Sequence, residues 1–180
     1  QALIRRIIIM DAIVYTSNTG STQEYAKLFS KKTGLPAYSL KEAEKKLPSG
    51  SKIIYMGWLA AGSVKGFGKA AKLYGVRALC GVGMGKTGSQ IQDIRKQNSV
   101  ADTTPVFMLQ GNFDMKKLHG VYRFMMQCMK LTVGKSLVKK EKKSADEKDM
   151  LDMLMNGGVR VKEENLSDLY GWYAKDGANL

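Results

Sequence analysis

The sequence contains little histidine, cysteine and proline. Its 180 residues include 1 histidine, 2 cysteines (Cys80 and Cys128) and 3 prolines. A single histidine, His119, argues against a histidine-based metal site and against a Ser-His-Asp triad. The spacing of the two cysteines fits no zinc motif. With 44% hydrophobic and 25% charged residues, the composition excludes collagen-like, mucin-like and disordered proteins. A chain of this length can bury a sizeable core without disulfide bonds.

Long apolar runs are absent as well. No uninterrupted run reaches the roughly 18 apolar residues that a membrane-spanning helix needs, and no convincing signal peptide is present. We therefore expect a protein of a reducing cytoplasm. Residues 1–9 read as a leader, either left over from cloning or an upstream extension, because a chain starting at Met10 would begin cleanly with a strand. Residues 10–180 are expected to form a single domain.

Acidic residues are the minority. The chain has 16 acidic and 29 basic residues, which gives a formal net charge of +13. The excess is concentrated between Lys116 and Lys143, where nine basic residues stand against one acid, Glu141. Such a field favours an anionic partner, which could be nucleic acid, a lipid surface or an acidic protein. A solvated basic face is an equally good interpretation.

Strand and helix signals alternate along the first two thirds of the chain. Short apolar runs predict five strands, at 12–15, 36–40, 52–57, 77–82 and 105–109. Apolar periodicity and end signals predict helices at 20–33, 64–74 and 90–97. Strands that alternate with helices form right-handed βαβ units, so the pattern predicts an α/β fold with a parallel sheet covered on both faces.

The last third, residues 116–180, is predicted to be a basic helical part. One helix presents a mostly apolar face, formed by Val121, Phe124, Met125, Cys128, Met129 and Thr132, beside a basic stripe of Lys116, Arg123 and Lys130. A capping-box pattern at Ser144 starts another helix, and a final helix is expected near 166–174. We expect both cysteines to be buried inert thiols, and the methionine cluster of this helix to belong to the core rather than to a contact surface.

The strongest local signal is the polar loop between the first strand and the first helix. It consists of Ser17, Asn18, Thr19, Gly20, Ser21 and Thr22. A helix N-terminus offers unpaired N–H groups and the positive end of the helix dipole, the four hydroxyls add donors, and the glycine allows close backbone approach. The loop contains no lysine or arginine, so we predict that it binds a phosphate through hydrogen bonds and the dipole. A serine- and threonine-rich N-cap is the alternative.

This loop resembles the FMN-phosphate loop of the flavodoxins, a Ser/Thr-x-Thr-Gly-x-Thr pattern after the first strand. The resemblance extends over most of the chain from Met10, and it implies a five-stranded parallel sheet in the order 2-1-3-4-5 with FMN at the switch point. Two further flavin loops are implied, one formed by Trp58, Leu59, Ala60, Ala61 and Gly62, the other by Gly83, Met84, Gly85, Lys86, Thr87 and Gly88.

Aromatic side chains that could stack on the flavin ring are few. Trp58 is the obvious candidate, and a tryptophan that covers the sheet edge is the alternative interpretation. The tyrosine that often stacks on the ring in the family is missing, and we expect Met84 to occupy that place.

Among flavodoxin-like proteins, the chain looks most similar to the protoporphyrinogen oxidases of this fold and their short relatives. The similar segments are the basic, Met-rich stretch 120–130 and the late helix at 168–174. The resemblance implies an FMN-dependent oxidoreductase that acts on an anionic porphyrin or a quinone, with peripheral membrane contact through 116–143 and no nucleic acid partner. No side chain need act as a catalytic nucleophile, because the flavin carries the chemistry.

Other functions stay open at this point. The chain could be a flavodoxin-type electron-transfer module that docks an acidic redox partner protein, although electron-carrier flavodoxins are usually acidic. It could also be a flavodoxin-like binding module without flavin. The segment Gly83 to Gly88 also fits G-x-G-x-x-G and nearly fits a Walker A loop. However, it follows the fourth strand, and no acidic residue is placed to hold a ribose or magnesium.

Overall fold

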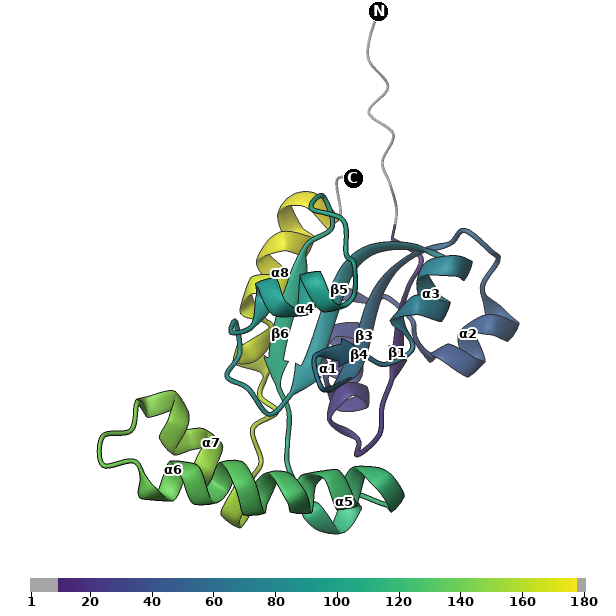
Figure 1. Cartoon of the computed structure of the whole chain (residues 1–180). Coiled ribbons are helices and arrows are strands. Elements are labelled where there is room, and N and C mark those ends of the chain that lie inside the picture. Colours follow the sequence, from purple (N-terminus) through teal and green to yellow (C-terminus); the bar gives the residue numbers. More distant parts are fainter. Residues whose placement is uncertain (1–9, 178–180) are drawn as a thin grey trace, which may run out of the picture.

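A mostly parallel β-sheet forms the centre of the molecule, with helices on both of its faces (Figure 1). The computed structural model describes residues 10–177, so the predicted leader at residues 1–9 lies outside the described residues. The body consists of β1 (Ala12–Thr16), α1 (Ser21–Thr33), β2 (Ala37–Ser39), α2 (Leu40–Lys46), β3 (Lys52–Ala60), β4 (Ser63–Val64), α3 (Phe67–Leu73), β5 (Gly75–Gly83), α4 (Ile91–Gln97) and β6 (Val106–Gln110). Helical elements follow: η1 (Met115–Lys117), α5 (Gly120–Met129), η2 (Lys130–Gly134), α6 (Lys135–Lys139), α7 (Ala145–Asn156), η3 (Glu163–Leu166), α8 (Ser167–Trp172) and η4 (Tyr173–Gly177).

The sheet has the order β2-β1-β3-β5-β6, and all of these neighbours pair in parallel. The predicted α/β class and parallel sheet are confirmed. The strand order differs from the predicted 2-1-3-4-5, because a sixth strand, β4, pairs antiparallel with β3 outside that order. Ala61 and Gly62 cause this difference: both have positive φ, +49° and +79°, which gives the tight turn that reverses a chain into a hairpin.

Two further predictions are wrong in detail. The second strand ends at Ser39, and helix α2 follows at once because Ser39 and Glu42 form a complete capping box. The helix predicted from Val64 begins only at Phe67, after Gly66 takes a left-handed conformation with φ +81°. Both errors arise where a cap or a positive-φ glycine, rather than apolar spacing, decides where an element begins.

Alternate residues of the strands enter two hydrophobic layers. Ile13 and Ile54 face α1 and α8, whereas Val14 and Ile53 face α2, α3 and α4. All four side chains are fully buried. Burying an aliphatic side chain of this size contributes about 1.5–3 kcal/mol, so these two layers supply most of the stability of the body.

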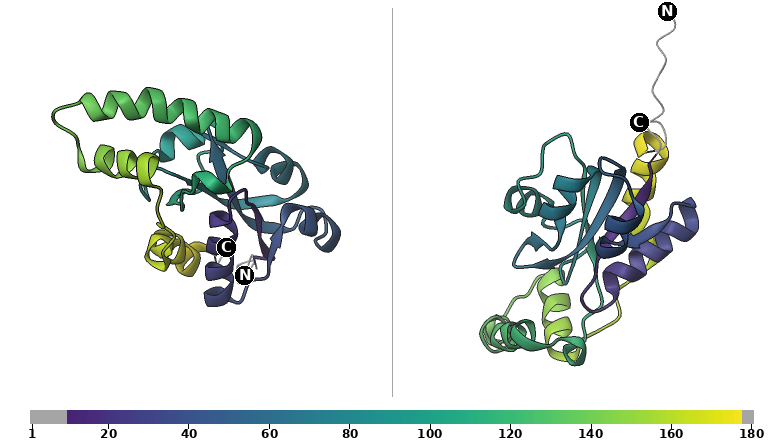
Figure 2. Two further views of the ribbon diagram at one scale, coloured as in Figure 1. Left: turned by 90° about the horizontal axis from the view of Figure 1, so that it is seen from below. Right: turned by 90° about the vertical axis from the view of Figure 1, so that its right-hand side faces the viewer.

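After β6 the chain leaves the sheet and forms a helical arm, residues 114–157. Phe113 and Gly158 pair in an antiparallel bridge where the chain leaves and returns. Helices α5, η2 and α6 continue one another as one long helix, and α7 runs back beside it (Figures 1 and 2). Contrary to expectation, Cys128 is exposed and α5 contains no buried residue, whereas Cys80 is buried as predicted.

Across residues 10–177, no helix combines the length and the apolar character needed to cross a bilayer.

Candidate functional site

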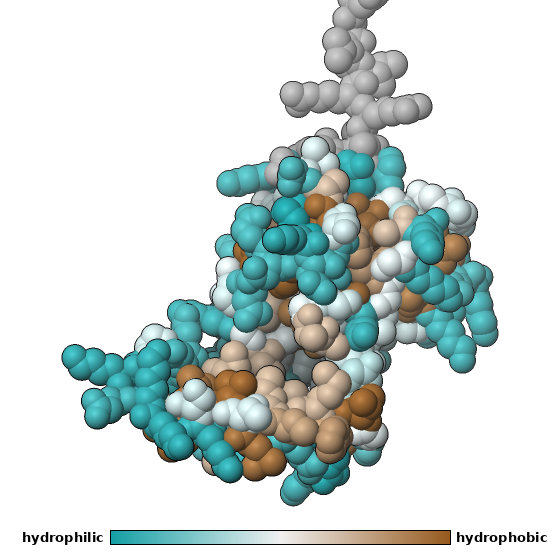
Figure 3. All heavy atoms as spheres, viewed as in Figure 1, coloured by the Kyte–Doolittle hydropathy of each residue, from teal (hydrophilic) through white to brown (hydrophobic). Residues whose placement is uncertain are grey.

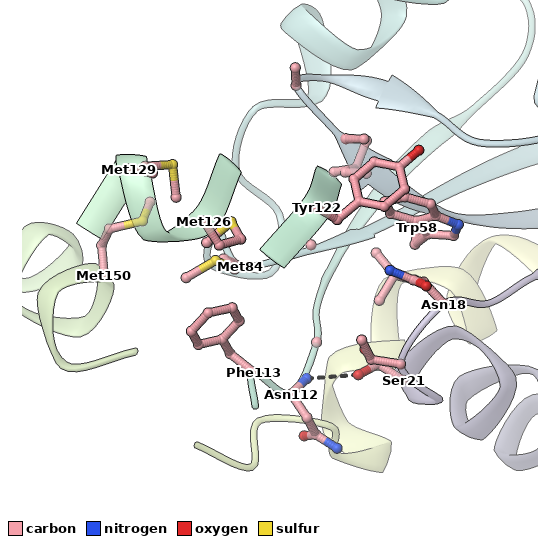
Figure 4. A pocket seen from close by; sticks show the side chains of 18 of the residues that line it. Asn18, Ser21, Trp58, Met84, Asn112, Phe113, Tyr122, Met126, Met129 and Met150 are labelled. Atoms are coloured by element: carbon pink, nitrogen blue, oxygen red, sulfur yellow. Dashed lines mark hydrogen bonds between the residues drawn. The ribbon is translucent and has the colours of Figure 1, made fainter. Parts of the chain in front are cut away.

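A pocket of about 620 Å³ lies between the carboxyl ends of the parallel strands and the helical arm. Its volume falls in the usual range for cofactor and ligand sites, about 300–1,000 Å³. The polar side chains Asn18 and Ser21 lie on one side of it, Trp58 and Tyr122 on another, and a group of methionines with Phe113 closes the far end (Figure 4). The space-filling view shows the hollow between the body and the arm (Figure 3).

The loop between β1 and α1 forms the polar end of this pocket. Four of its predicted residues line the cavity: Asn18, Thr19, Ser21 and Thr22. Ser17 and Gly20 do not, and the Ser17 hydroxyl instead accepts a hydrogen bond from the Gly20 N–H at 3.2 Å. Ser17 therefore shapes the loop, while Thr19, Ser21 and Thr22 line the cavity.

The N-terminus of α1 lies at this polar end without a side-chain cap. No side-chain hydrogen bond caps it within the described part of the chain, whereas Ser39 and Ser144 complete capping boxes at α2 and α7. Gly20 has φ +106°, and no atom lies within 4 Å of the position that a Cβ would occupy there. The first N–H groups of a 13-residue helix and its positive dipole end are thus available to an anion.

Among residues 10–177, the charged side chains that line the pocket are all acidic. They are Asp114, Asp146 and Glu147, and no lysine or arginine of this part of the chain lines it. All three acids belong to the arm, and none belongs to the loop after β1. An anion at the polar end would consequently be held by N–H and hydroxyl donors without a cationic side chain, as the loop sequence predicts.

The second predicted loop is part of a β-hairpin. All five residues from Trp58 to Gly62 line the pocket, but Trp58 to Ala60 belong to β3, where Leu59 and Ala60 pair with β4 and Trp58 pairs with Val82 of β5. The Trp58 ring meets the Tyr122 ring edge-on, with 4.8 Å between centroids and an interplanar angle of 85°. Tyr122 comes from α5, so an aromatic pair from the body and the arm forms this wall.

The third predicted loop, after β5, contributes only its first half. Gly83, Met84 and Gly85 line the pocket. Lys86, Thr87 and Gly88 do not: Lys86 pairs with Asp146 at 3.4 Å, and the Thr87 hydroxyl accepts a hydrogen bond from the Gln110 N–H at 3.0 Å. The Gly88 N–H donates to the Met108 carbonyl, so this second half fastens the loop to β6.

A fourth loop, after β6, was not among the predicted site residues. Asn112 and Phe113 line the pocket, and the Asn112 N–H donates to the Ser21 hydroxyl at 3.0 Å (Figure 4). The Asn112 side-chain oxygen accepts from the N–H groups of Arg160 and Val161, at 2.6 and 2.8 Å. Asn112 therefore joins the polar loop, β6 and the returning chain. Its place just beyond a parallel strand is the signal that could have found it.

The far end of the pocket is rich in methionine. Six of the eleven methionines of the chain line the pocket: Met84, Met108, Met125, Met126, Met129 and Met150. The predicted assignment of the α5 methionines to the core is wrong, because none of them is buried: Met126 packs partly buried against the cluster of Phe113, Leu118 and Met153, and Met125 is 46% exposed. Methionine is flexible and polarizable, so such a wall adapts to flat apolar or aromatic molecules.

No family model matches the chain, and neither a curated protein nor a solved structure shows significant similarity to it.

The nucleotide motifs that compete at Gly83 to Gly88 fit the geometry poorly. In a Walker A loop the lysine and the following threonine open a helix, but α4 begins only at Ile91. The Lys86 side chain is 66% exposed and the Thr87 hydroxyl is engaged by β6, so neither is placed to bind a phosphate in the pocket.

Proposed function

We propose that the protein binds FMN in this pocket and works as a flavodoxin-like oxidoreductase on a small molecule. The observation that carries the proposal is the polar end of the pocket. There, an uncapped 13-residue helix begins, and Thr19 and Thr22 line the cavity at the carboxyl edge of a parallel sheet. This donor set suits a phosphate, and the edge where parallel strands end is where open α/β sheets bind nucleotide cofactors.

The rest of the pocket suits a flat ring system next to that phosphate. Trp58 and Tyr122 offer aromatic surface, and the backbone at Gly83 and Gly85 allows close approach to a ring edge. Gly83 is restricted by its neighbours, since a Cβ there would lie 3.0 Å from Leu59 Cδ1. FMN bound here would supply electron and hydride transfer, while the chain orients it and limits access of water.

The helical arm favours an oxidoreductase over a plain electron carrier. Met126, Met129 and Met150 cover the far end of the pocket, which leaves an apolar chamber beyond the polar loop. A carrier needs its flavin edge open to a partner protein, whereas a covered chamber holds a small substrate against the ring. The basic charge of the arm supports the second candidate, an electron-transfer module that docks an acidic partner protein.

The first test is flavin binding by the purified protein. We expect it to retain an FMN absorption band after desalting, and to bind FMN much more tightly than riboflavin, which lacks the phosphate. Thr19→Asp places a carboxylate at the polar end, so we expect FMN affinity to fall about 10- to 100-fold while riboflavin affinity changes little. Thr103→Asp, at an exposed position outside the pocket lining, is the matched control.

Two outcomes would contradict the proposal. Folded protein that retains no flavin at micromolar concentration would exclude it, and so would equal FMN affinity in Thr19→Asp and Thr103→Asp. Oxidation of the reduced flavin by a small-molecule acceptor without any partner protein then separates the two candidates. Turnover under those conditions supports the oxidoreductase, and its absence supports the electron-transfer module.

A further inference from the structure

Helix α5 carries apolar side chains on two opposite faces. Its inner face presents Tyr122, Met126 and Met129 to the pocket. A second apolar line runs along the other side and continues into η2. We call it the outer stripe, and its members, three or four residues apart, are Val121, Phe124, Cys128 and Leu131.

The outer stripe faces solvent. The exposed fractions of Val121, Phe124 and Leu131 are 63%, 65% and 59%, and Cys128 is exposed as well. None of the four lines the pocket or belongs to a hydrophobic cluster among residues 10–177. The long helix lies along the edge of the molecule in the views of Figures 1 and 2, where only α7 runs beside it. Figure 3 shows apolar side chains gathered over the arm between hydrophilic groups. Packing within the described chain therefore does not account for this line.

Positive charge is concentrated in the segment that carries the outer stripe. The basic residues of this segment are Lys116, Lys117, Arg123, Lys130, Lys135, Lys139, Lys140, Lys142 and Lys143. Within residues 10–177, Lys140 alone among them has a carboxylate partner, Glu147 at 2.6 Å. A second copy of the chain on this stripe would bring like charges together, which argues against self-association.

We propose that the outer stripe and its flanking basic residues dock the helical arm on an anionic membrane surface. The helix from Gly120 to Lys139 is about 30 Å long and would lie in the plane of the interface. Its aliphatic and aromatic side chains enter the boundary between headgroups and acyl chains, and the lysines reach the phosphates with their long stems. An exposed apolar stripe on a strongly basic helix fits such a surface, and the binding does not depend on a flavin in the pocket.

The exposed thiol offers a direct probe of docking. Cys128 lies in the outer stripe, whereas Cys80 is buried, so a thiol-reactive environment-sensitive fluorophore labels Cys128 selectively. We expect a blue shift and higher emission when the labelled protein meets phosphatidylcholine vesicles that contain phosphatidylserine. Vesicles of phosphatidylcholine alone should give at least about tenfold weaker binding, and added salt should remove most of the binding.

Unlabelled variants test the stripe and the charges separately, with vesicle sedimentation as the measurement. We expect Phe124→Ser with Leu131→Ser, and Lys135→Gln with Lys139→Gln, each to weaken binding about tenfold or more. The matched controls are Val159→Ser, an apolar residue that is 74% exposed outside the stripe, and Lys41→Gln with Lys72→Gln on the body. Unchanged thermal unfolding would show that the variants keep the fold.

Three results would overturn the proposal. One is equal binding to both vesicle types, and another is normal binding by the Phe124/Leu131 variant. The third is a shift of the Cys128 probe with polyglutamate but not with anionic vesicles, which would assign the surface to an acidic protein.

Discussion

The body and helix α5 of the helical arm use the same kinds of apolar residue in opposite ways. In the body, Ile13, Ile54 and Phe29 are fully buried in layers against the sheet. In the arm, α5 is as rich in apolar residues as any helix of the body, yet none of its residues is buried. Apolar side chains thus hold the body together, whereas in α5 they make surfaces, one toward the pocket and one toward solvent.

This contrast implies that substitutions in the body and substitutions in the arm change different measured quantities. A change in the body should be measured mainly as a change in the free energy of unfolding. A change in the arm should be measured mainly in ligand or surface binding, and in local opening, because few buried contacts fasten it. The predictions below test that separation.

The largest effect on stability is expected at Gly66. A Cβ there would contact the Tyr55 hydroxyl and lie 2.6 Å from Thr16 Oγ1, and the residue has φ +81°. We expect Gly66→Ala to lower the free energy of unfolding by about 2–5 kcal/mol, measured by urea denaturation. Gly68→Ala, two residues on in α3 and open on all sides, should instead be stabilising by about 0.5–1 kcal/mol. Equal changes in the free energy of unfolding for the two substitutions would show that the close packing around Gly66 does not affect stability.

A smaller effect is expected for Tyr55→Phe. The Tyr55 hydroxyl donates to the Lys65 carbonyl at 2.8 Å and accepts from the Thr16 hydroxyl at 2.6 Å. Removing it should cost about 1–2 kcal/mol at neutral pH, measured from urea denaturation.

The same variant tests the pH dependence of stability. Burial raises the pKa of Tyr55 to about 12, although its hydrogen bond from Thr16 acts in the opposite direction. Above pH 10 the unfolded tyrosine loses its proton while the folded one keeps it, so the wild-type protein loses stability as the pH rises toward 12. The stability gap between wild type and Tyr55→Phe should therefore narrow over this range. A stability gap that stays constant over this pH range would mean that the pKa of Tyr55 in the folded protein is not raised.

The smallest effect on global stability is expected at the contact between arm and body. The Asp149 carboxylate of α7 accepts from the Gln110 amide at 2.6 Å and from the Arg160 guanidinium at 3.2 Å. Asp149→Ala should accelerate amide hydrogen exchange in α7 and leave exchange in α1 unchanged, with a shift in Tm of only a few degrees. Asp152→Ala, which removes one Arg160 contact at 3.1 Å and a hydrogen bond from Asn156 within α7 at 2.8 Å but no contact with β6, is the milder control. Faster exchange throughout the body would contradict the independence of the two regions.

Apolar periodicity was sufficient to predict most of the body. The apolar run at 12–15 is a strand buried on both faces, the helix that follows it buries one face, and that helix ends at Thr33 as predicted, with Gly34 in a left-handed conformation as its C-cap. Helix α2 and strand β4 were missed because they depend on local devices, the capping box at Ser39 and the Ala61-Gly62 turn. Elements this short contain too few residues to show an apolar periodicity, so caps and turns decide where they form.

The arm was predictable as helix but not in its packing. Tyr122 and Phe124 are both aromatic, and spacing alone cannot tell which lines a cavity and which meets solvent. That choice depends on the bridge between Phe113 and Gly158, which fixes how the arm turns relative to the sheet. For the same reason the polar loop at Ser17 to Thr22 was found from the sequence, whereas the contribution of Asn112 needed the tertiary structure.

The bridge between Phe113 and Gly158 also divides the chain into a frame and an insert. The two residues exchange a pair of backbone hydrogen bonds, each 2.9 Å long, so the inserted segment begins and ends at one place. Because both ends of the segment are fixed at this bridge, the segment can be lengthened, shortened or replaced without moving the strands to which it is attached. A different segment can therefore be inserted at this junction. Such a change would alter which ligands fit the pocket and leave the loops of the body unchanged.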